Sequence, residues 1–326
     1  MSRPLALLTA LLLAAAGAAA VGLMAGSHAL APAEVLSALS AREPTLAHDI
    51  VLEVRLPRVS AALACGALLA LAGVLLQVLL RNPLADPYVL GISGGAGLGV
   101  LIAMLFGLGQ AVASVAGFGG AFGAALVVFG LGYRAGDWNL YRLLLTGVVL
   151  AAGCGALISL LLVLAPQGTV KGMLFWLMGD LSSAPGAGWA WAVALALGGL
   201  AVVRAGTLNV LSLGRLRAAA LGVPVRAAET AIYFAAALAT VSAVMLGGTI
   251  GFVGLIVPHL VRLLGVSDLR WLTPLAMLAG AGFLCLADTL ARTAWAPLQL
   301  PVGVLTALLG VPVMLLLLAR RPGSER

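Results

Sequence analysis

Residues 59–80 read VSAALACGALLALAGVLLQVLL, an uncharged apolar run that ends at Arg81-Asn82-Pro83. An α-helix needs roughly 20 mainly apolar residues to cross the hydrocarbon layer of a membrane, and this run is long enough. Over the whole chain of 326 residues, 63% are hydrophobic and only 9% are charged. A water-soluble domain of this size does not have such a composition, so the sequence predicts a membrane protein.

Similar apolar runs recur along the rest of the chain and predict an all-α fold with about ten transmembrane helices. The ten runs lie at 5–26, 59–80, 89–109, 111–133, 141–165, 189–203, 227–247, 250–264, 272–291 and 300–319. The first run also has features of a signal peptide, and we favour an uncleaved first span. The eighth is short and contains Pro258, while almost nothing separates the third from the fourth.

Positive charges are distributed unevenly among the segments that join these runs. Cytoplasmic loops of membrane proteins carry an excess of Lys and Arg, so we place the start of the chain in the cytoplasm. With both termini in the cytoplasm, thirteen of the 18 basic residues fall on that side. The five on the opposite side are Arg42, Arg55, Arg58, Lys171 and Arg292. This orientation makes 27–58 and 166–188 outer segments and 204–226 a basic cytoplasmic segment, which is either an ordinary loop or a docking surface.

Several functions are excluded by what the sequence lacks. No GxxxxGK[ST] sequence occurs, so the usual phosphate-binding loop of an ATPase is missing and any ATP hydrolysis must come from a partner. No HExxH or GxSxG motif occurs either, and we predict a chain that is not an enzyme and holds no cofactor or metal. The basic residues form no patch with interleaved aromatic residues, which argues against nucleic acid as a binding partner.

The segment after the run 59–80 contains Asn82, Pro83, Asp86 and Pro87. Proline lacks an amide hydrogen and restricts the residue before it, so this segment breaks the helical pattern. We predict a rigid elbow on the cytoplasmic side.

The elbow begins the motif RNPLADPYVLGISGGAGLG at 81–99, which resembles the signature of the permease family that imports iron chelates, haem and vitamin B12. A second long motif, GGTIGFVGLIVPHLVRLLG at 247–265, resembles the same family. Further matches are RLPR at 55–58, YRLLLTGVVL at 141–150, the LGxxxAxxLGV pattern at 213–223, and LPVGVLTALLGVPV at 300–313. The resemblance covers nearly the whole chain.

This resemblance implies a single permease domain over 1–326 with an inverted internal repeat, in which spans 2–5 and spans 7–10 have opposite orientations. It also implies a bacterial inner-membrane importer of the type II ABC class. Its expected partners are the lipid bilayer, a second copy of the chain, two ATP-binding subunits that carry ATP and magnesium, and a periplasmic substrate-binding protein. The implied substrate is a ferric siderophore, haem or vitamin B12; the alternative function is an ion-gradient-driven secondary transporter.

The resemblance also assigns roles to residues at the two membrane surfaces. Arg55, Arg58 and Arg292 match basic residues that meet acidic side chains of the binding protein. Arg292 lies four residues after Asp288, so a pair within one helix is an equally open interpretation. The residues that match the ATPase-coupling helices are Leu213, Gly214, Arg215, Arg217, Ala218, Leu221 and Gly222. Many relatives have an acidic residue where this chain has Arg215, so the matching ATPase surface is expected to differ in charge.

Four residues around span 5 are predicted to line or close the transport pathway. Leu140 and Tyr141 match a position where the family narrows the pathway, although a membrane-interface aromatic is an equal alternative. Gly147 and Ala151 are small residues four apart, which mark a pathway wall, a packed helix pair or a contact between copies.

Overall fold

The computed structural model describes residues 3–26, 28–40, 45–134, 137–138, 140–182 and 186–319. In chain order the elements are α1 (Arg3–Met24), α2 (Pro32–Ser40), α3 (Leu46–Asp49), η1 (Ile50–Arg55), α4 (Leu56–Leu80), η2 (Pro87–Leu90), α5 (Ile92–Leu105), α6 (Gln110–Gly132), β1 (Tyr133–Arg134), β2 (Asp137–Trp138), α7 (Leu140–Leu164), α8 (Gln167–Met178), α9 (Gly188–Val203), α10 (Ala205–Ser212), α11 (Arg215–Ala220), α12 (Val225–Gly247), α13 (Val253–Leu263), α14 (Leu269–Thr293) and α15 (Val302–Ala319). Apart from the short antiparallel pair β1 and β2, the described chain is helical, which confirms the all-α prediction.

Every predicted apolar run coincides with a helix of the structure. Among the described residues, six helices are long and apolar enough to cross a membrane, and α9 with α10 forms a seventh candidate that is bent by 68°. The remaining three runs correspond to the shorter apolar helices α5, α13 and α15. The count of ten spans therefore stays a prediction, because α5 with 14 residues and α13 with 11 are shorter than a full crossing, and α15 with 18 is at the short end of the range.

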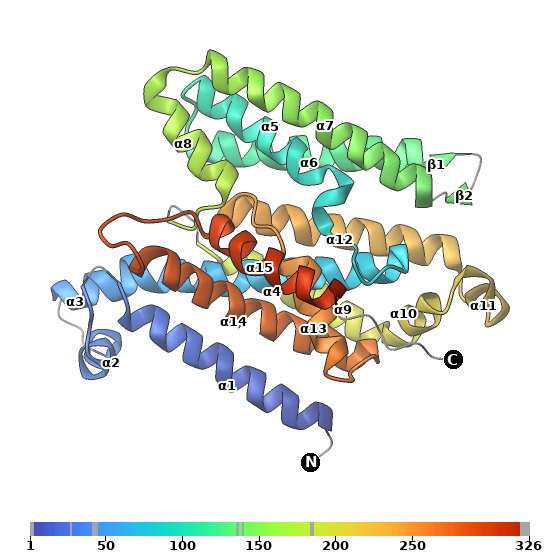
Figure 1. Ribbon diagram of the computed structural model, residues 1–326, viewed down its shortest axis with the longest axis horizontal. Helices are drawn as coiled ribbons and strands as arrows, with labels where there is room; N and C mark the ends of the chain where they lie inside the picture. Colours follow the sequence, from blue (N-terminus) through green and yellow to red (C-terminus); the bar gives the residue numbers. More distant parts are fainter. Residues whose placement is uncertain are drawn as a thin grey trace.

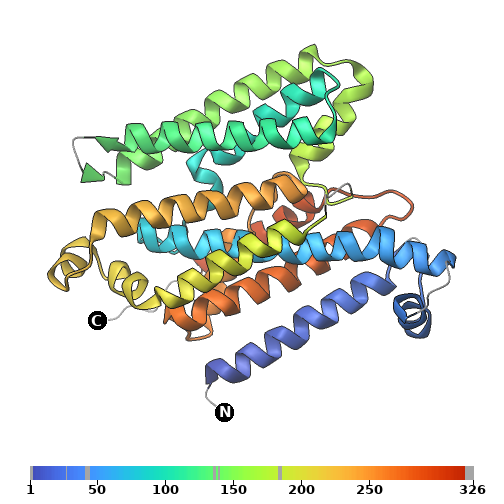
Figure 2. The same ribbon diagram turned by 180° about the vertical axis from the view of Figure 1, so that it is seen from behind.

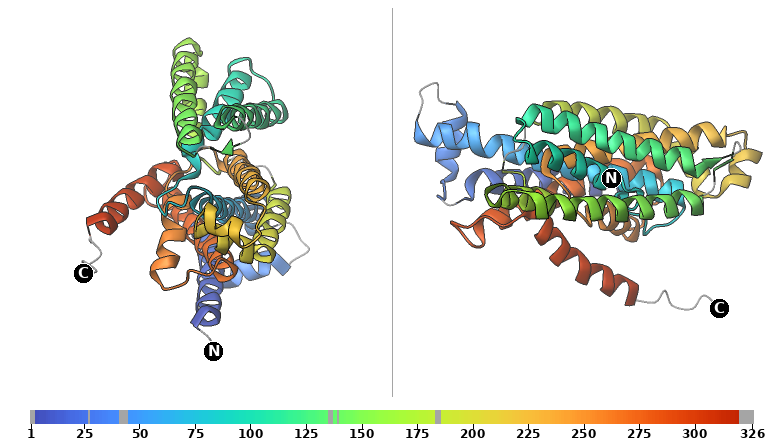
Figure 3. Two further views of the ribbon diagram at one scale, coloured as in Figure 1. Left: turned by 90° about the vertical axis from the view of Figure 1, so that its right-hand side faces the viewer. Right: turned by 90° about the horizontal axis from the view of Figure 1, so that it is seen from above.

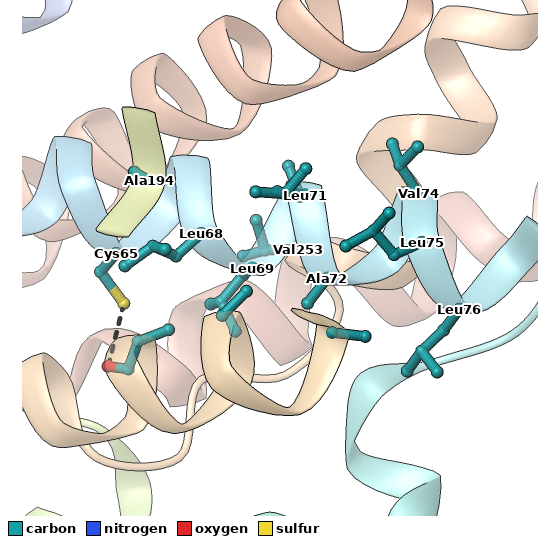
Figure 4. Close-up of a cluster of buried hydrophobic side chains, with 14 of the residues drawn as sticks. Cys65, Leu68, Leu69, Leu71, Ala72, Val74, Leu75, Leu76, Ala194 and Val253 are labelled. Atoms are coloured by element: carbon teal, nitrogen blue, oxygen red, sulfur yellow. Dashed lines mark hydrogen bonds between the residues drawn. The ribbon is translucent and has the colours of Figure 1, made fainter. Parts of the chain in front are cut away.

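Helix α4 lies at the centre of the molecule and packs against α14, α12, α13, α9 and α1 (Figure 1). Its side chains are almost all buried, and Figure 4 shows Leu68 near Ala194 of α9 and Leu69 near Val253 of α13. Small residues allow these close approaches. A methyl group on Gly73 would lie only 2.6 Å from the carbonyl carbon of Gly254 in α13, so the two backbones are in direct contact.

Helices α5, α6, α7 and α8 form a second group beside α12 (Figures 1 and 2). Within it, α5 and α6 are in close contact, and glycines stand at the crossing. Most side chains of α7 are exposed. Helix α15 is also largely exposed, and Figure 3 shows it standing out from the helices around α4. A membrane protein can cover such apolar faces with lipid or with another subunit.

The two ends of the molecule carry different features. We name the end that carries α2, α3 and the start of α4 the α2 end, and the end that carries residues 81–84, α10 and α11 the elbow end (Figure 1). Helix α1 starts and α15 finishes at the elbow end. An even number of membrane crossings would place the start of α1 and the end of α15 at the same end.

Two stretches of the chain have the same order of elements in opposite directions. Helix α4 runs toward the elbow end, breaks, and is followed by the short helix α5; α12 runs toward the α2 end, breaks at 248–252, and is followed by the short helix α13. The two breaks meet, because the backbone N–H of Ile250 donates to the hydroxyl of Tyr88 at 2.9 Å. This arrangement is the one expected of an inverted repeat.

Candidate functional site

The elbow is held by its own side chains. Helix α4 ends at Leu80, and Arg81 caps it in a left-handed conformation with φ of 50°. The side chain of Asn82 accepts a hydrogen bond from the backbone N–H of Leu84 at 2.9 Å, and Asp86 accepts one from Tyr88 at 2.7 Å. With Pro83 and Pro87 fixing two backbone angles, the chain turns back into the molecule as a defined loop.

Two of the four predicted pathway residues pack against this elbow. A Cβ atom on Gly147 of α7 would lie 2.5 Å from the carbonyl oxygen of Val89, and one on Gly91 would lie 3.2 Å from the amide nitrogen of Ala151. Both sites therefore serve close packing of α7 against η2. Leu140 is half-buried and Tyr141 is 75% exposed at the start of α7. A pathway role for the four residues stays a prediction.

The segment 204–226 forms two short helices at the elbow end. Glycine is required at both of its turns, because φ is 111° at Gly214 and 78° at Gly222. Leu213, Leu216 and Leu221 are largely exposed there. Ala218 is buried and Arg217 is exposed. Apolar side chains that face outward beside arginines form a surface on which another protein can dock.

This segment is tied to two long helices. The Nε of Arg215 lies 3.2 Å from a carboxylate oxygen of Glu229, a buried residue of α12. The positive charge of Arg215 is thus balanced within the chain. The side chain of Asn209 in α10 donates to Asp268 at 2.7 Å and accepts from the backbone N–H of Leu269 at 3.0 Å. Movement of α10 and α11 would therefore be transmitted to α12 and α14.

Asp268 caps the start of α14 and is exposed. Hydrogen bonds from the backbone N–H of Arg270 and from the Asn209 side chain lower the pKa of this carboxyl group. A lowered pKa in the folded state stabilises the fold at pH values above the ordinary Asp range, and that contribution is lost as the pH falls through the lowered pKa. The tie between α10 and α14 is accordingly formed at neutral pH.

A buried ion cluster lies at the α2 end. Arg58 of α4 and Asp288 of α14 form a bidentate pair, with Nε–Oδ2 at 3.0 Å and Nη2–Oδ1 at 2.9 Å. Arg58 also donates to Gln299 at 2.8 Å, and Arg292 lies 3.7 Å from Asp288. Asp288 is only 1% exposed. The ion pair between Asp288 and Arg292 within α14, one of the two interpretations of the sequence, is present, and Arg58 also binds Asp288.

Arg292 and Arg55 are also used inside the chain. Arg292 donates to the carbonyl oxygen of Gly22 in α1. Arg55 donates to the carbonyl oxygens of Leu23 and Met24 at 2.7 and 2.8 Å, and it also donates to that of His28. In this conformation the three arginines predicted to dock a binding protein are buried and fasten α1 to α4 and α14. Their docking role stays a prediction.

A cavity of about 600 Å³ opens near the same end, between α5, α6, α8 and residues 297–299. Its walls are both apolar and polar: Met104, Phe175 and Trp176 contribute apolar surface, and Lys171 and Asp180 contribute charge. A space of this kind suits a bulky solute that has polar groups on its edge.

Comparison with known sequences places these features in a family. The sequence model of the FecCD transport family matches residues 6–320. The chain belongs to the FecCD transport family. This is a family of ABC permease subunits, which are transport components and not themselves ATPases. The family predicted from the motifs is thereby confirmed.

Characterised members are similar over most of the chain. The hemin transport system permease HmuU of Yersinia pestis is 41% identical over 284 residues, which cover 83% of this chain and 84% of that protein. The vitamin B12 import system permease BtuC of Klebsiella pneumoniae is 38% identical over 308 residues, which cover 93% of this chain and 90% of that protein. A solved structure of a metal-chelate type ABC transporter in an inward-facing conformation has a TM-score of 0.84 and 30% identity, covering 98% of this chain and all of that one.

The structure brings together some residues that sequence reasoning did not connect. The bidentate Arg58–Asp288 pair joins residues 230 positions apart, and the Asn209–Asp268 bond joins residues 59 apart. A signal for the first was present, because an ionisable residue within an apolar helix usually has a partner. No comparable signal marks Asn209, which lies outside the predicted apolar runs.

Proposed function

We propose that this chain is the membrane-spanning subunit of an ABC importer that moves a metal chelate from the periplasm to the cytoplasm. The observation that carries the proposal is the match along nearly the whole chain to a hemin permease and a vitamin B12 permease. The transport family and the inward-facing structural relative support the same mechanism. The substrate class is a ferric siderophore, haem or a corrinoid.

In this proposal two copies of the chain form the pathway between them. The exposed faces of α7 and α15 support the proposal, since these helices have few neighbours within one copy. Two ATPase subunits, which carry ATP and magnesium, dock on α10 and α11 at the elbow end. That end faces the cytoplasm, as do both termini. A binding protein docks at the α2 end, which faces the periplasm, and delivers substrate near the 600 Å³ cavity.

The proposed mechanism follows from the ties at the elbow end. When the ATPases bind ATP and close, they displace α10 and α11. The Arg215–Glu229 pair and the Asn209–Asp268 hydrogen bond then pull on α12 and α14. Those helices pack on α4, and the break after α12 packs on the elbow, so one displacement reaches both repeats.

A test is co-purification with a candidate ATPase and a candidate binding protein from the same organism. We expect a complex of two permeases and two ATPases whose ATP hydrolysis rises several-fold with the loaded binding protein. Titrating the binding protein with haem, cyanocobalamin and a ferric siderophore should give tight binding for one class only. A chain that forms no complex with any such ATPase would contradict the proposal.

A further inference from the structure

A small cationic pocket lies at the elbow end, partly lined by the elbow itself. Its volume is about 240 Å³. Three parts of the chain form its walls: the end of α4 with the elbow, the end of α10, and the α13–α14 connection. The residues that line it are Gln77, Val78, Arg81, Asn82, Pro83, Ser212, Arg262, Ser267 and Leu269. Two arginines and several polar groups therefore share one space, with no acidic residue in its lining.

One of the two arginines is oriented by a buried amide. The side-chain oxygen of Gln77 accepts a hydrogen bond from Arg262, and Gln77 is only 3% exposed. Its nitrogen donates to the carbonyl oxygen of Leu255 at 3.2 Å, so the amide cannot turn freely. A guanidinium has five N–H donors, and this bond uses the Nη1 group alone. Arg262 is thereby positioned with donors to spare.

Arg81, the second arginine, also lines the pocket. Arg81 occupies the left-handed position that ends α4, so its backbone is fixed by the cap. Its Nη1 is 3.9 Å from where a Cβ atom on Gly214 would stand, which places the guanidinium beside the turn between α10 and α11. Within the described part of the chain, neither Arg81 nor Arg262 forms an ion pair.

Two positive charges in one pocket repel each other unless an anion lies between them. A carboxylate or a phosphate accepts hydrogen bonds from two guanidinium groups in a favourable geometry. The position of the pocket favours one source for that anion. Because Ser212 of α10 forms part of the wall, an occupant must enter beside the helices on which the ATPase docks.

We infer that an Asp or Glu side chain of the ATPase subunit enters this pocket and is bound by Arg81 and Arg262. The inference rests on the proposed function and adds a second contact between the ATPase and this chain. The carboxylate joins the ATPase to α4, the elbow and α13 at the same time as α10 and α11 are docked. The ATPase then acts directly on both repeats.

The test measures the affinity of the cognate ATPase for the permease in nanodiscs made of phosphatidylcholine. We expect Arg81→Glu to weaken binding by about tenfold to a hundredfold, since it places a like charge against the acidic side chain. Arg81→Asn keeps a residue that tolerates the left-handed conformation, so it should fold normally and weaken binding less. Arg3→Glu reverses a charge at the same end outside the pocket and should change affinity less than about threefold.

A rescue experiment identifies the acidic residue. Reversing the ATPase's surface Asp and Glu residues one at a time should yield one variant that binds Arg81→Glu better than it binds the wild-type permease. Equal affinities for Arg81→Glu and Arg3→Glu would overturn the inference. So would an effect of Arg81→Glu that appears only in nanodiscs containing phosphatidylglycerol, because a lipid would then be the occupant. If the wild-type chain binds no ATPase, the proposed function fails instead.

Discussion

Replacing Asp288 by alanine is expected to lower the free energy of unfolding by about 3–5 kcal/mol, the usual cost of removing one partner of a buried ion pair. The carboxylate is 1% exposed and lies 2.9 Å from Arg58 and 3.7 Å from Arg292. Without it, two guanidinium groups remain buried with no counter-charge. Unfolding by denaturant in mixed micelles, followed by circular dichroism, measures the loss.

Two matched variants separate charge from packing. Glu53→Ala removes a carboxylate from an exposed position at the same end and should change the free energy of unfolding by less than about 0.5 kcal/mol. Replacing Arg58, Asp288 and Arg292 together by Met, Leu and Met removes the whole cluster, and its stability should return close to that of the wild type. A loss below about 1 kcal/mol for Asp288→Ala would show that the cluster does not stabilise the fold.

The same cluster affects how docking of the binding protein is tested. Reversing the charges of Arg55, Arg58 and Arg292 removes hydrogen bonds that fasten α1 to α4 and α14. A lower affinity for the binding protein would then arise from altered structure as readily as from a lost contact. The docking prediction is therefore best tested by crosslinking the binding protein to single cysteines at Glu53 and Lys171, which are exposed at this end.

Gly73→Ala is the second substitution expected to have a large effect, at about 3 kcal/mol of stability. The new methyl group would overlap the carbonyl group of Gly254, so α4 and α13 would have to separate. Gly254 also lies against Pro87, since a Cβ atom added to this glycine would stand 2.8 Å from the proline ring, so the elbow would move as well. Both stability and ATP-driven transport should fall.

Gly123→Ala in α6 is the matched control. No heavy atom lies within 4 Å of a Cβ at that position, so the substitution meets no steric conflict. Alanine has a higher helix propensity than glycine, and the variant should be as stable as the wild type or gain up to about 1 kcal/mol. If Gly73→Ala were as well tolerated as Gly123→Ala, the close contact between α4 and α13 would be wrong.

The long helices could be predicted because burial in lipid requires continuous apolar runs. The run 59–80 lies within α4, whose start is three residues earlier at Leu56. The break after α4 was predicted at the prolines of the elbow. The break at 248–252 was not, because the feature noted in the run 250–264 was Pro258, which lies inside α13. The meeting of the two breaks was not predicted either, since the hydrogen bond from Ile250 to Tyr88 depends on a fold that joins residues 162 positions apart.

The candidate site was less predictable for a related reason. The motif at 55–58 identified Arg58, but the motif alone does not tell whether a guanidinium faces a partner protein or Asp288. Gly147 was recognisable as a site of close approach, yet the surface it contacts is η2, which only the folded chain shows. Side-chain partners of this kind depend on which helix faces meet, and a uniformly apolar helix has no marked face.

The most direct measurement of the central claim is uptake into proteoliposomes that contain this chain with its ATPase, with the binding protein outside. Uptake of the cognate haem, corrinoid or ferric siderophore should require ATP and magnesium on the ATPase side and should stop when the binding protein is omitted. A proton or sodium gradient should have no effect. Gradient-driven uptake by this chain alone, without ATP or the ATPase, would contradict the account and identify a secondary transporter.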